Sequence, residues 1–299
     1  MLLIMYINDM TRCVLKTNIS LYADDSKLYN SVNSKTDCNH LQADINRCTR
    51  WCKQWKMKLN LNKCNLITFT NKKSFITKKY SINGKPINIV DSVKDLGVIL
   101  SQNFNFSIHI GVIVNKAFKM LGLLKRTCSA FEDVRVFKSL YFSIVRSNLE
   151  YCSHVWSPSQ KYLIAKLERV QIKFIKYLCY KAQIPFKTNM YLNLCKQFNI
   201  PTLESRRQVL DLIFLYKCIN NYYDTSYILG EIHFHFPERV LRQNSYFKLG
   251  SYRINVRKFS FLPRVCAHFN NIIIDSDNSI DLCESLFKFK NKLQSIFYK

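Results

Sequence analysis

Acidic residues are scarce in this sequence of 299 residues. It contains 20 Asp and Glu against 45 Lys and Arg, so its formal net charge is +25. Such an excess opposes compaction unless the protein works on a polyanion, and nucleic acid is the polyanion that this composition favours. Ribosomal and histone-like proteins share the property, so charge alone does not select a function. A membrane surface is disfavoured because no isolated basic amphipathic helix is found at a terminus.

Paired cysteine motifs, a signal peptide and long uncharged runs are also lacking. Of the 12 cysteines, no two are spaced as C-x-x-C, and Cys48 and Cys52 have no matching His or Cys pair downstream. This excludes the common zinc patterns. We therefore expect reduced, buried thiols and a location in the nucleus and cytoplasm. No stretch is long and uncharged enough to cross a bilayer, so no membrane partner is expected.

Two adjacent carboxylates, Asp24 and Asp25, are predicted at the tip of a β-hairpin over residues 18–30. Apolar and polar side chains alternate before the pair, as in a half-buried strand. Neighbouring acids repel each other, and a divalent cation is the usual compensation because carboxylate oxygens are its preferred ligands. In two-metal phosphoryl transfer such ions activate the attacking hydroxyl and neutralise the leaving group. The alternative is a solvated turn, which Asp also favours.

Further segments resemble one family in the same order along the chain. YADD (22–25) within an apolar hairpin resembles the polymerase-palm signature of reverse transcriptases, and LLIMYINDM (2–10) resembles the end of the helix that precedes it in non-LTR retrotransposon enzymes. WCKQWKMKLNLNKCNLITF (51–69) resembles the next palm element, and VKDLGVIL (93–100) the primer-grip strand. The segments similar to the thumb and post-thumb region of jockey-like elements are HIGVIVNKAFKMLGLLKR (109–126), LYFSIVRSNLEYCSHVWSP (140–158) and LERVQIKFIK (167–176).

This resemblance implies roles for the hairpin residues. Asp24 would be a metal-ligating carboxylate, with Asp25 assisting the metal site or the hairpin itself. Tyr22 would lie near the primer terminus. The implied cofactor is Mg²⁺, two ions in the intact enzyme, and the implied substrates are an RNA template, a DNA primer and deoxynucleotide triphosphates.

The resemblance also implies roles downstream. Lys63, at a helix–strand junction, is the candidate for protonating the departing pyrophosphate, a general-acid role suited to a Lys beside anionic phosphates. An ordinary surface lysine is the alternative. Leu96 and Gly97 would shape the primer grip, because Gly allows a close approach of the backbone to nucleic acid.

One part of the family pattern is not found. A complete palm carries a third Asp on a strand upstream of the first matching helix, and neither this strand nor the fingers is present, while Asp9 stands at a different place in the motif. We expect the chain to be the C-terminal part of a retrotransposon reverse transcriptase, from a truncated gene model or a decayed copy, and inactive by itself. The alternative is a non-catalytic nucleic-acid-binding relic. The oligomeric state stays open.

Periodicity predicts an α+β chain in three parts. Residues 1–102 are expected to form a partial palm, 103–180 a helical thumb-like region, and 181–299 a mostly helical basic region. In the first part we expect a helix over 37–58 capped by Thr36, a strand over 65–70, a hairpin with an Asn83-Gly84 turn, and a strand over 93–100. The apolar positions expected along the helix are Leu41, Ile45, Cys48, Cys52, Trp55 and Leu59.

A basic stripe is predicted along one helix of the second part. In residues 161–180 apolar side chains recur at helical spacing, at Leu163, Leu167, Val170, Phe174 and Leu178. The stripe beside them consists of Lys166, Arg169, Lys173 and Lys176. A helix that follows a phosphate backbone needs such a stripe, although a solvated face on an ordinary amphipathic helix has the same pattern.

Overall fold

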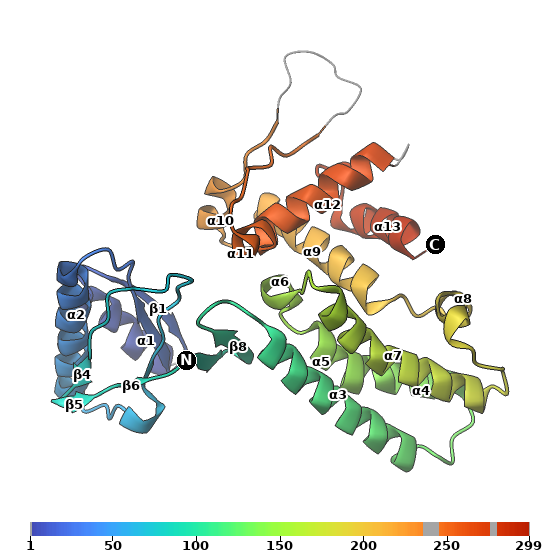
Figure 1. Cartoon of the computed structure of the whole chain (residues 1–299), viewed down its shortest axis with the longest axis horizontal. Helices are drawn as coiled ribbons and strands as arrows, with labels where there is room; N and C mark the ends of the chain where they lie inside the picture. Colours follow the sequence, from blue (N-terminus) through green and yellow to red (C-terminus); the bar gives the residue numbers. More distant parts are fainter. Residues whose placement is uncertain (1, 236–244, 276–279, 299) are drawn as a thin grey trace. The chain divides into compact units, whose positions relative to one another are not determined.

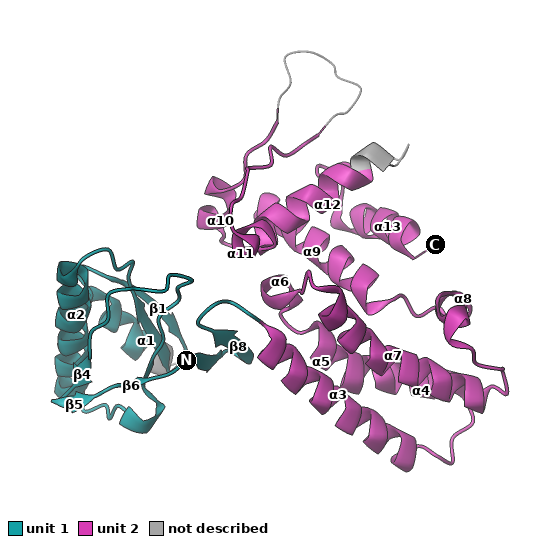
Figure 2. Cartoon of the chain, in the orientation of Figure 1, with its two compact units in different colours: residues 1–105 teal, residues 106–299 magenta. Residues whose placement is uncertain are grey.

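Short strands and helices alternate in the first third of the chain, and helices make up most of the rest (Figure 1). The computed structural model describes residues 2–235, 245–275 and 280–298. The chain divides into unit 1, residues 1–105, and unit 2, residues 106–299 (Figure 2). This mixture confirms the α+β class.

The strands of unit 1 form two-stranded ladders, three antiparallel and one parallel, among its described residues. Its helical elements are α1 (Leu2–Asn8), η1 (Asp9–Cys13), α2 (Lys35–Gln54) and η2 (Leu61–Lys63). Its strands are β1 (Asn18–Tyr22), β2 (Asp25–Tyr29), β3 (Asn65–Leu66), β4 (Ser81–Ile82), β5 (Lys85–Pro86), β6 (Asn88–Ile89), β7 (Ser92–Asp95) and β8 (Val98–Ser101).

The hairpin predicted over residues 18–30 is confirmed. Strands β1 and β2 pair in antiparallel fashion, and Tyr22 lies opposite Asp25, so Ala23 and Asp24 form the two-residue turn. One face of the hairpin packs against Cys48, Trp51 and Cys52 of α2 through Ile19, Leu21 and Leu28. Period-two alternation places the remaining side chains on the other face. We call this the open face; it carries Ser20, Tyr22, Asp25, Lys27 and Tyr29.

Helix α2 begins and ends earlier than predicted. Its N-cap is Ser34 and not Thr36: the Ser34 hydroxyl accepts from the Asp37 amide, and the Asp37 carboxylate accepts from the Ser34 amide. This reciprocal capping box satisfies amide groups that a helix start leaves unpaired. The helix ends at Gln54, so Trp55 and Leu59 lie beyond it and are 39% and 36% exposed.

Two of the remaining strand predictions need correction. The strand expected over 65–70 is a ladder over only Asn65–Leu66, parallel to β6. The strand expected over 93–100 is a hairpin of β7 and β8, because Leu96 and Gly97, with φ of 43° and 90°, turn the chain back. The Asn83-Gly84 hairpin is confirmed, and both residues have positive φ, as its tight turn requires.

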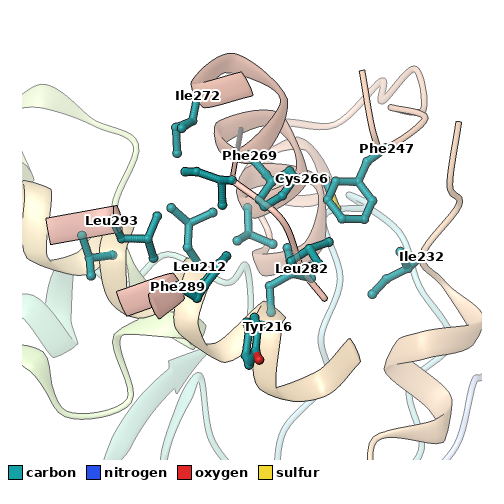
Figure 3. Packing of buried hydrophobic residues seen from close by; sticks show 14 residues of the cluster. Leu212, Tyr216, Ile232, Phe247, Cys266, Phe269, Ile272, Leu282, Phe289 and Leu293 are labelled. Carbon is teal, nitrogen blue, oxygen red and sulfur yellow. The ribbon is translucent and has the colours of Figure 1, made fainter. Parts of the chain in front are cut away.

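The described secondary structure of unit 2 is helical, apart from an antiparallel β-bridge between Phe234 and Phe247. Its core packs around Phe269, Phe289, Leu212 and Tyr216, contributed by helices far apart in the sequence (Figure 3). In chain order its elements are α3 (Ser107–Thr127), α4 (Val134–Leu140), the π-helical segment η3 (Tyr141–Arg146), α5 (Ser147–Glu150), α6 (Ser153–Trp156), α7 (Lys161–Lys181), η4 (Thr188–Met190), α8 (Tyr191–Gln197), α9 (Leu203–Ile219), α10 (Ser226–Gly230), α11 (Asn255–Lys258), α12 (Phe261–Asp275) and α13 (Leu286–Phe297).

One prediction for α7 is confirmed and one expectation for α3 is wrong. The five apolar residues predicted for the buried face of α7 are all at most 2% exposed. Among the described residues, α3 is long and apolar enough to cross a membrane by length and composition, contrary to our expectation that no stretch has these properties. One such helix is weak evidence for a membrane span, and Ile110, Val114 and Leu121 of α3 are buried within the protein.

Candidate functional site

The acidic turn lies at the exposed end of the β1–β2 hairpin. Asp24 occupies the turn, Asp25 begins β2 on the open face, and both are exposed. Tyr22 stands opposite Asp25 and is 64% exposed. Ala23 has a φ of 51°, in the left-handed region that residues with a Cβ rarely adopt. The structure therefore brings together three of the residues that the sequence singled out.

The donor set at this turn is incomplete for a two-metal centre. Among the described residues, no group of three His, Cys, Asp or Glu side chains is placed to hold a metal ion. Asp24 and Asp25 offer carboxylate oxygens, the ligands that Mg²⁺ prefers, but they leave the turn without a carboxylate that bridges two ions. These residues therefore fit part of a metal site, and no catalytic step follows from them alone.

Asp44 fixes the chain that leads into the hairpin. This fully buried carboxylate of α2 accepts hydrogen bonds from the backbone amides of Leu15, Lys16 and Thr17, at 2.9 to 3.1 Å. It also forms an ion pair with Arg47. Burial works against the charged form, but these donors outweigh it and lower the pKa of Asp44 to about 2. The start of β1 is thereby attached to the helix on which the hairpin packs.

The other residues predicted for unit 1 lie apart from the carboxylates. Lys63 ends η2, is exposed, and makes no hydrogen bond or ion pair with Asp24 or Asp25. Leu96 and Gly97 form the β7–β8 turn, which directly follows Asp95. The carboxylate of Asp95 forms an ion pair with Lys27 on the open face, so this second hairpin is attached to the first.

The predicted basic stripe lies along the contact between α3 and α7. The Lys166 ammonium lies over Gly111 of α3, where a Cβ would be 3.5 Å from it, and the Lys173 ammonium is 5.0 Å from the ring centroid of Phe118. Gly111 and Phe118 are seven residues apart, as are Lys166 and Lys173, so the two helices run parallel along this contact. Arg169 and Lys176 are exposed on the same arc of α7.

A lysine from α3 joins this stripe. Lys125 is half-buried, and its ammonium lies 5.0 Å from the ring centroid of Tyr177 on α7. Burial and repulsion from Lys173 and Lys176 hold the pKa of Lys125 below its usual value. We call Lys125, Lys166, Arg169, Lys173 and Lys176 the basic seam. Among the ion pairs of the described residues none involves a member of it.

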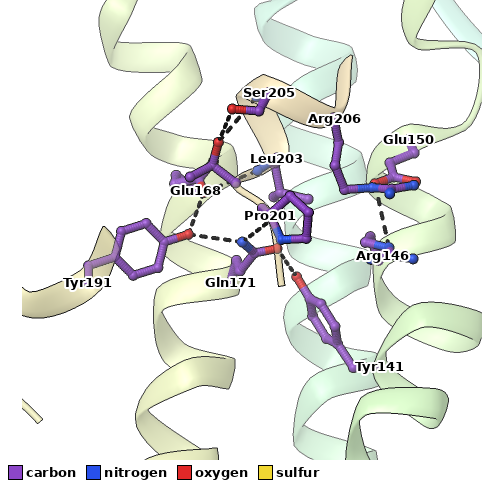
Figure 4. A network of polar contacts seen from close by, with 11 residues as sticks. Tyr141, Arg146, Glu150, Glu168, Gln171, Tyr191, Pro201, Leu203, Ser205 and Arg206 are labelled. Atoms are coloured by element: carbon purple, nitrogen blue, oxygen red, sulfur yellow. Dashed lines mark hydrogen bonds and ion pairs between the residues drawn. The ribbon is translucent and has the colours of Figure 1, made fainter. Parts of the chain in front are cut away.

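The opposite side of α7 is held by a buried polar network (Figure 4). Gln171 accepts a hydrogen bond from Tyr141 at 3.1 Å and donates to Tyr191 at 3.0 Å and to the Pro201 carbonyl at 2.9 Å. Glu168 accepts a hydrogen bond from Tyr191, and burial raises the pKa of Glu168 despite that bond. Because Gln171 is held by three partners, α7 keeps one rotational setting, with its basic residues on the side away from this network.

Several curated proteins that match this chain are RNA-directed DNA polymerases of mobile elements. It is 27% identical to the RNA-directed DNA polymerase from mobile element jockey of Drosophila melanogaster over 163 residues, 53% of the chain and 18% of that protein. The probable RNA-directed DNA polymerase from transposon X-element of the same species is 24% identical over 172 residues, 54% of the chain and 18% of that protein. The chain resembles jockey-like RNA-directed DNA polymerases.

Other comparisons set the extent of this similarity. An uncharacterized protein of Caenorhabditis elegans is 29% identical over 159 residues, 53% of the chain and 73% of that protein. The chain spans less than a fifth of the length of the jockey and X-element polymerases. No protein-family model and no solved structure matches it.

Sequence reasoning missed three features that surround the predicted residues of this polymerase-like chain. Lys125 could have been found, because Gly111, Phe118 and Lys125 repeat every seven residues on α3. Asp44 and the pair of Lys27 with Asp95 gave no local signal, since their partners lie 27 to 68 residues away.

Proposed function

We propose that this chain is the C-terminal part of a reverse transcriptase, the RNA-directed DNA polymerase of a non-LTR retrotransposon. The observation that carries the proposal is the Asp24–Asp25 turn at the tip of a hairpin packed on α2, in a chain half of which is similar to jockey polymerases. On this proposal unit 1 is part of the palm and α3 to α7 are thumb-like. The substrates of the intact protein are template RNA, primer DNA and deoxynucleotides, and it works in the nucleus and cytoplasm.

The proposal gives the hairpins of unit 1 distinct tasks. Asp24 and Asp25 are the carboxylates that would contribute to Mg²⁺ binding in the intact polymerase, together with a third carboxylate from outside the described residues. Tyr22, Leu96 and Gly97 would contact the primer strand. Lys63 forms no hydrogen bond or ion pair with Asp24 or Asp25, so its role as the acid for pyrophosphate rests on the resemblance alone.

In unit 2 the proposal assigns the basic seam to the phosphate backbone. Its lysines and arginine lie along one side of a helix whose other sides are packed, and they lack carboxylate partners among the described residues. A cation without a carboxylate partner can replace a counterion of a phosphate, and the released counterion favours binding. A helix that follows a backbone reads no base edges, so sequence preference should be weak.

Salt dependence tests this assignment. The logarithm of the association constant should fall linearly with the logarithm of salt concentration, by about 0.7 to 0.9 per phosphate contacted. Changing four seam residues to Gln should reduce the slope by roughly 3 if all four contact phosphate. The four are Lys166, Arg169, Lys173 and Lys176.

A matched variant controls for the loss of overall charge. Four exposed lysines outside α3 and α7 are changed to Gln, and this variant should keep the slope of the wild type. They are Lys187, Lys196, Lys248 and Lys288. Equal slopes in the seam variant and the wild type would contradict the seam assignment.

A non-catalytic nucleic-acid-binding relic is the second candidate. The observation in its favour is the contrast between a complete basic seam and an acidic turn without a third carboxylate among the described residues. Translating the genomic sequence upstream of Met1 separates the two. An open frame with fingers and a third Asp supports the polymerase, whereas a stop codon or an unrelated promoter supports the relic.

A further inference from the structure

The open face of the β1–β2 hairpin carries a lysine close to the acidic turn. Asp25 and Lys27 are two positions apart on β2, so both side chains lie on this face, roughly 7 Å apart along the strand. Tyr22 and Ser20 are their cross-strand partners. A free ammonium here would partly neutralise the acidic turn, so the partner of Lys27 matters for the site.

That partner is Asp95, 68 residues further along the chain. The Lys27 ammonium lies 2.5 Å from one Asp95 carboxylate oxygen and 2.6 Å from the other, and both side chains are partly buried. Asp95 is the last residue of β7, so the Leu96-Gly97 turn follows it directly. The ion pair therefore joins the residue before the Leu96-Gly97 turn to β2, the strand that begins at Asp25.

The turn that follows Asp95 has an unfavourable backbone. Leu96 has a φ of 43°, in the left-handed region that a branched side chain rarely adopts. Such a conformation persists only where neighbouring contacts hold it, and it is often found where a site needs a fixed geometry. A partly exposed ion pair adds little to overall stability, so the contribution of this pair is chiefly to geometry.

We propose that Lys27 and Asp95 are positioning residues, whose ion pair holds the Leu96-Gly97 turn beside the Asp24–Asp25 turn so that one strand end can contact both. The inference rests on the proposed polymerase function and deepens it. The ligand is the 3′ end of a primer paired with a template. Lys27 and Asp95 act through the two turns and not by contact with the reacting atoms.

Site-specific crosslinking of a primer tests this role. The probe is a DNA primer with a 3′-terminal 4-thiothymidine, annealed to template RNA, irradiated with the full chain and mapped by mass spectrometry. In the wild type we expect crosslinks in both segments, 18–29 and 92–101. Asp95→Asn and Lys27→Gln should each lower the yield at 92–101 relative to 18–29 at least fivefold. The double variant should lower it no further, because the two residues form one pair.

Two control variants separate positioning from a general loss of structure. Lys27→Arg keeps the ion pair and should keep the wild-type ratio. Lys94→Gln removes an exposed lysine from the same hairpin and should also leave the ratio unchanged. A ratio that is unchanged in Asp95→Asn, or lowered equally in Lys94→Gln, would overturn the inference and leave the proposed function standing. If the wild type gave no crosslink in segment 18–29 and none in segment 92–101, this result would overturn the proposed function itself.

Discussion

The buried carboxylate of Asp44 links the ionisation of one residue to the stability of the hairpin. Its amide donors, from Leu15, Lys16 and Thr17, all belong to the segment that enters β1. Since they hold the pKa of Asp44 at about 2, below its usual value, its contribution is present at neutral pH. The contribution is lost as pH falls from about 4 through about 2, where the carboxylate takes up a proton in the folded state.

We therefore predict that the advantage of the wild type over Asp44→Asn shrinks on acidification. The difference in unfolding free energy should fall by on the order of 2 kcal/mol over this range. Urea unfolding of the full chain at pH 6 and pH 2.5, followed by tryptophan fluorescence, measures it. Other carboxylates titrate in both proteins, so they cancel in the difference. A difference that is constant between the two pH values would contradict the role of Asp44.

The start of α2 is decided between two residues that are equally good N-caps by residue type. Ser34 and Thr36 are both acceptable N-caps, and only Ser34 has an acid three residues later. In the structure this acid, Asp37, completes the capping box, whereas Thr36 lies inside the helix and is exposed. The helix start therefore depends on a reciprocal pair and not on one residue type.

We predict that Ser34→Ala lowers the unfolding free energy by about 1 kcal/mol, because the Asp37 amide loses its acceptor. Thr36→Ala is the matched control, and it should change stability by less than about 0.5 kcal/mol, since this side chain is exposed on a formed helix. Urea unfolding of both variants measures the difference. Equal losses would show that the cap is not at Ser34.

At the scale of the whole molecule, the acidic turn belongs to unit 1 and the basic seam to unit 2. The two also differ in whether the residues needed for their proposed roles are present. The seam is formed by residues of α3 and α7 that are all described, whereas the turn has two carboxylates and, among the described residues, no third side chain placed to share a metal ion with them. Binding and catalysis should therefore separate in this chain.

We predict that the purified chain binds nucleic acid but extends no primer on an RNA or DNA template with Mg²⁺. The reason is that two carboxylates on one turn cannot bridge and orient two metal ions. Primer extension at micromolar protein, followed on a sequencing gel, measures the activity. Asp24→Asn is the control. Extension above background in the wild type that disappears in this variant would contradict the prediction.

Local patterns were sufficient for much of this protein. The β1–β2 hairpin, the Asn83-Gly84 turn and the buried face of α7 were all predicted, because alternation, turn residues and helical spacing act between near neighbours in the chain. The basic stripe of α7 was predicted for the same reason, although the pattern alone left open whether it was a solvated face.

Tertiary structure decided the features that involve distant residues. Folding brings Asp95 to Lys27, Asp44 to the segment before β1, and Lys125 to the stripe of α7. It also made a hairpin of the strand expected over 93–100, because a Leu in left-handed conformation is not signalled by residue type. The charge of +25 and the order of motifs belong to the sequence, whereas the pairing of charges depends on distances that only the packed chain sets.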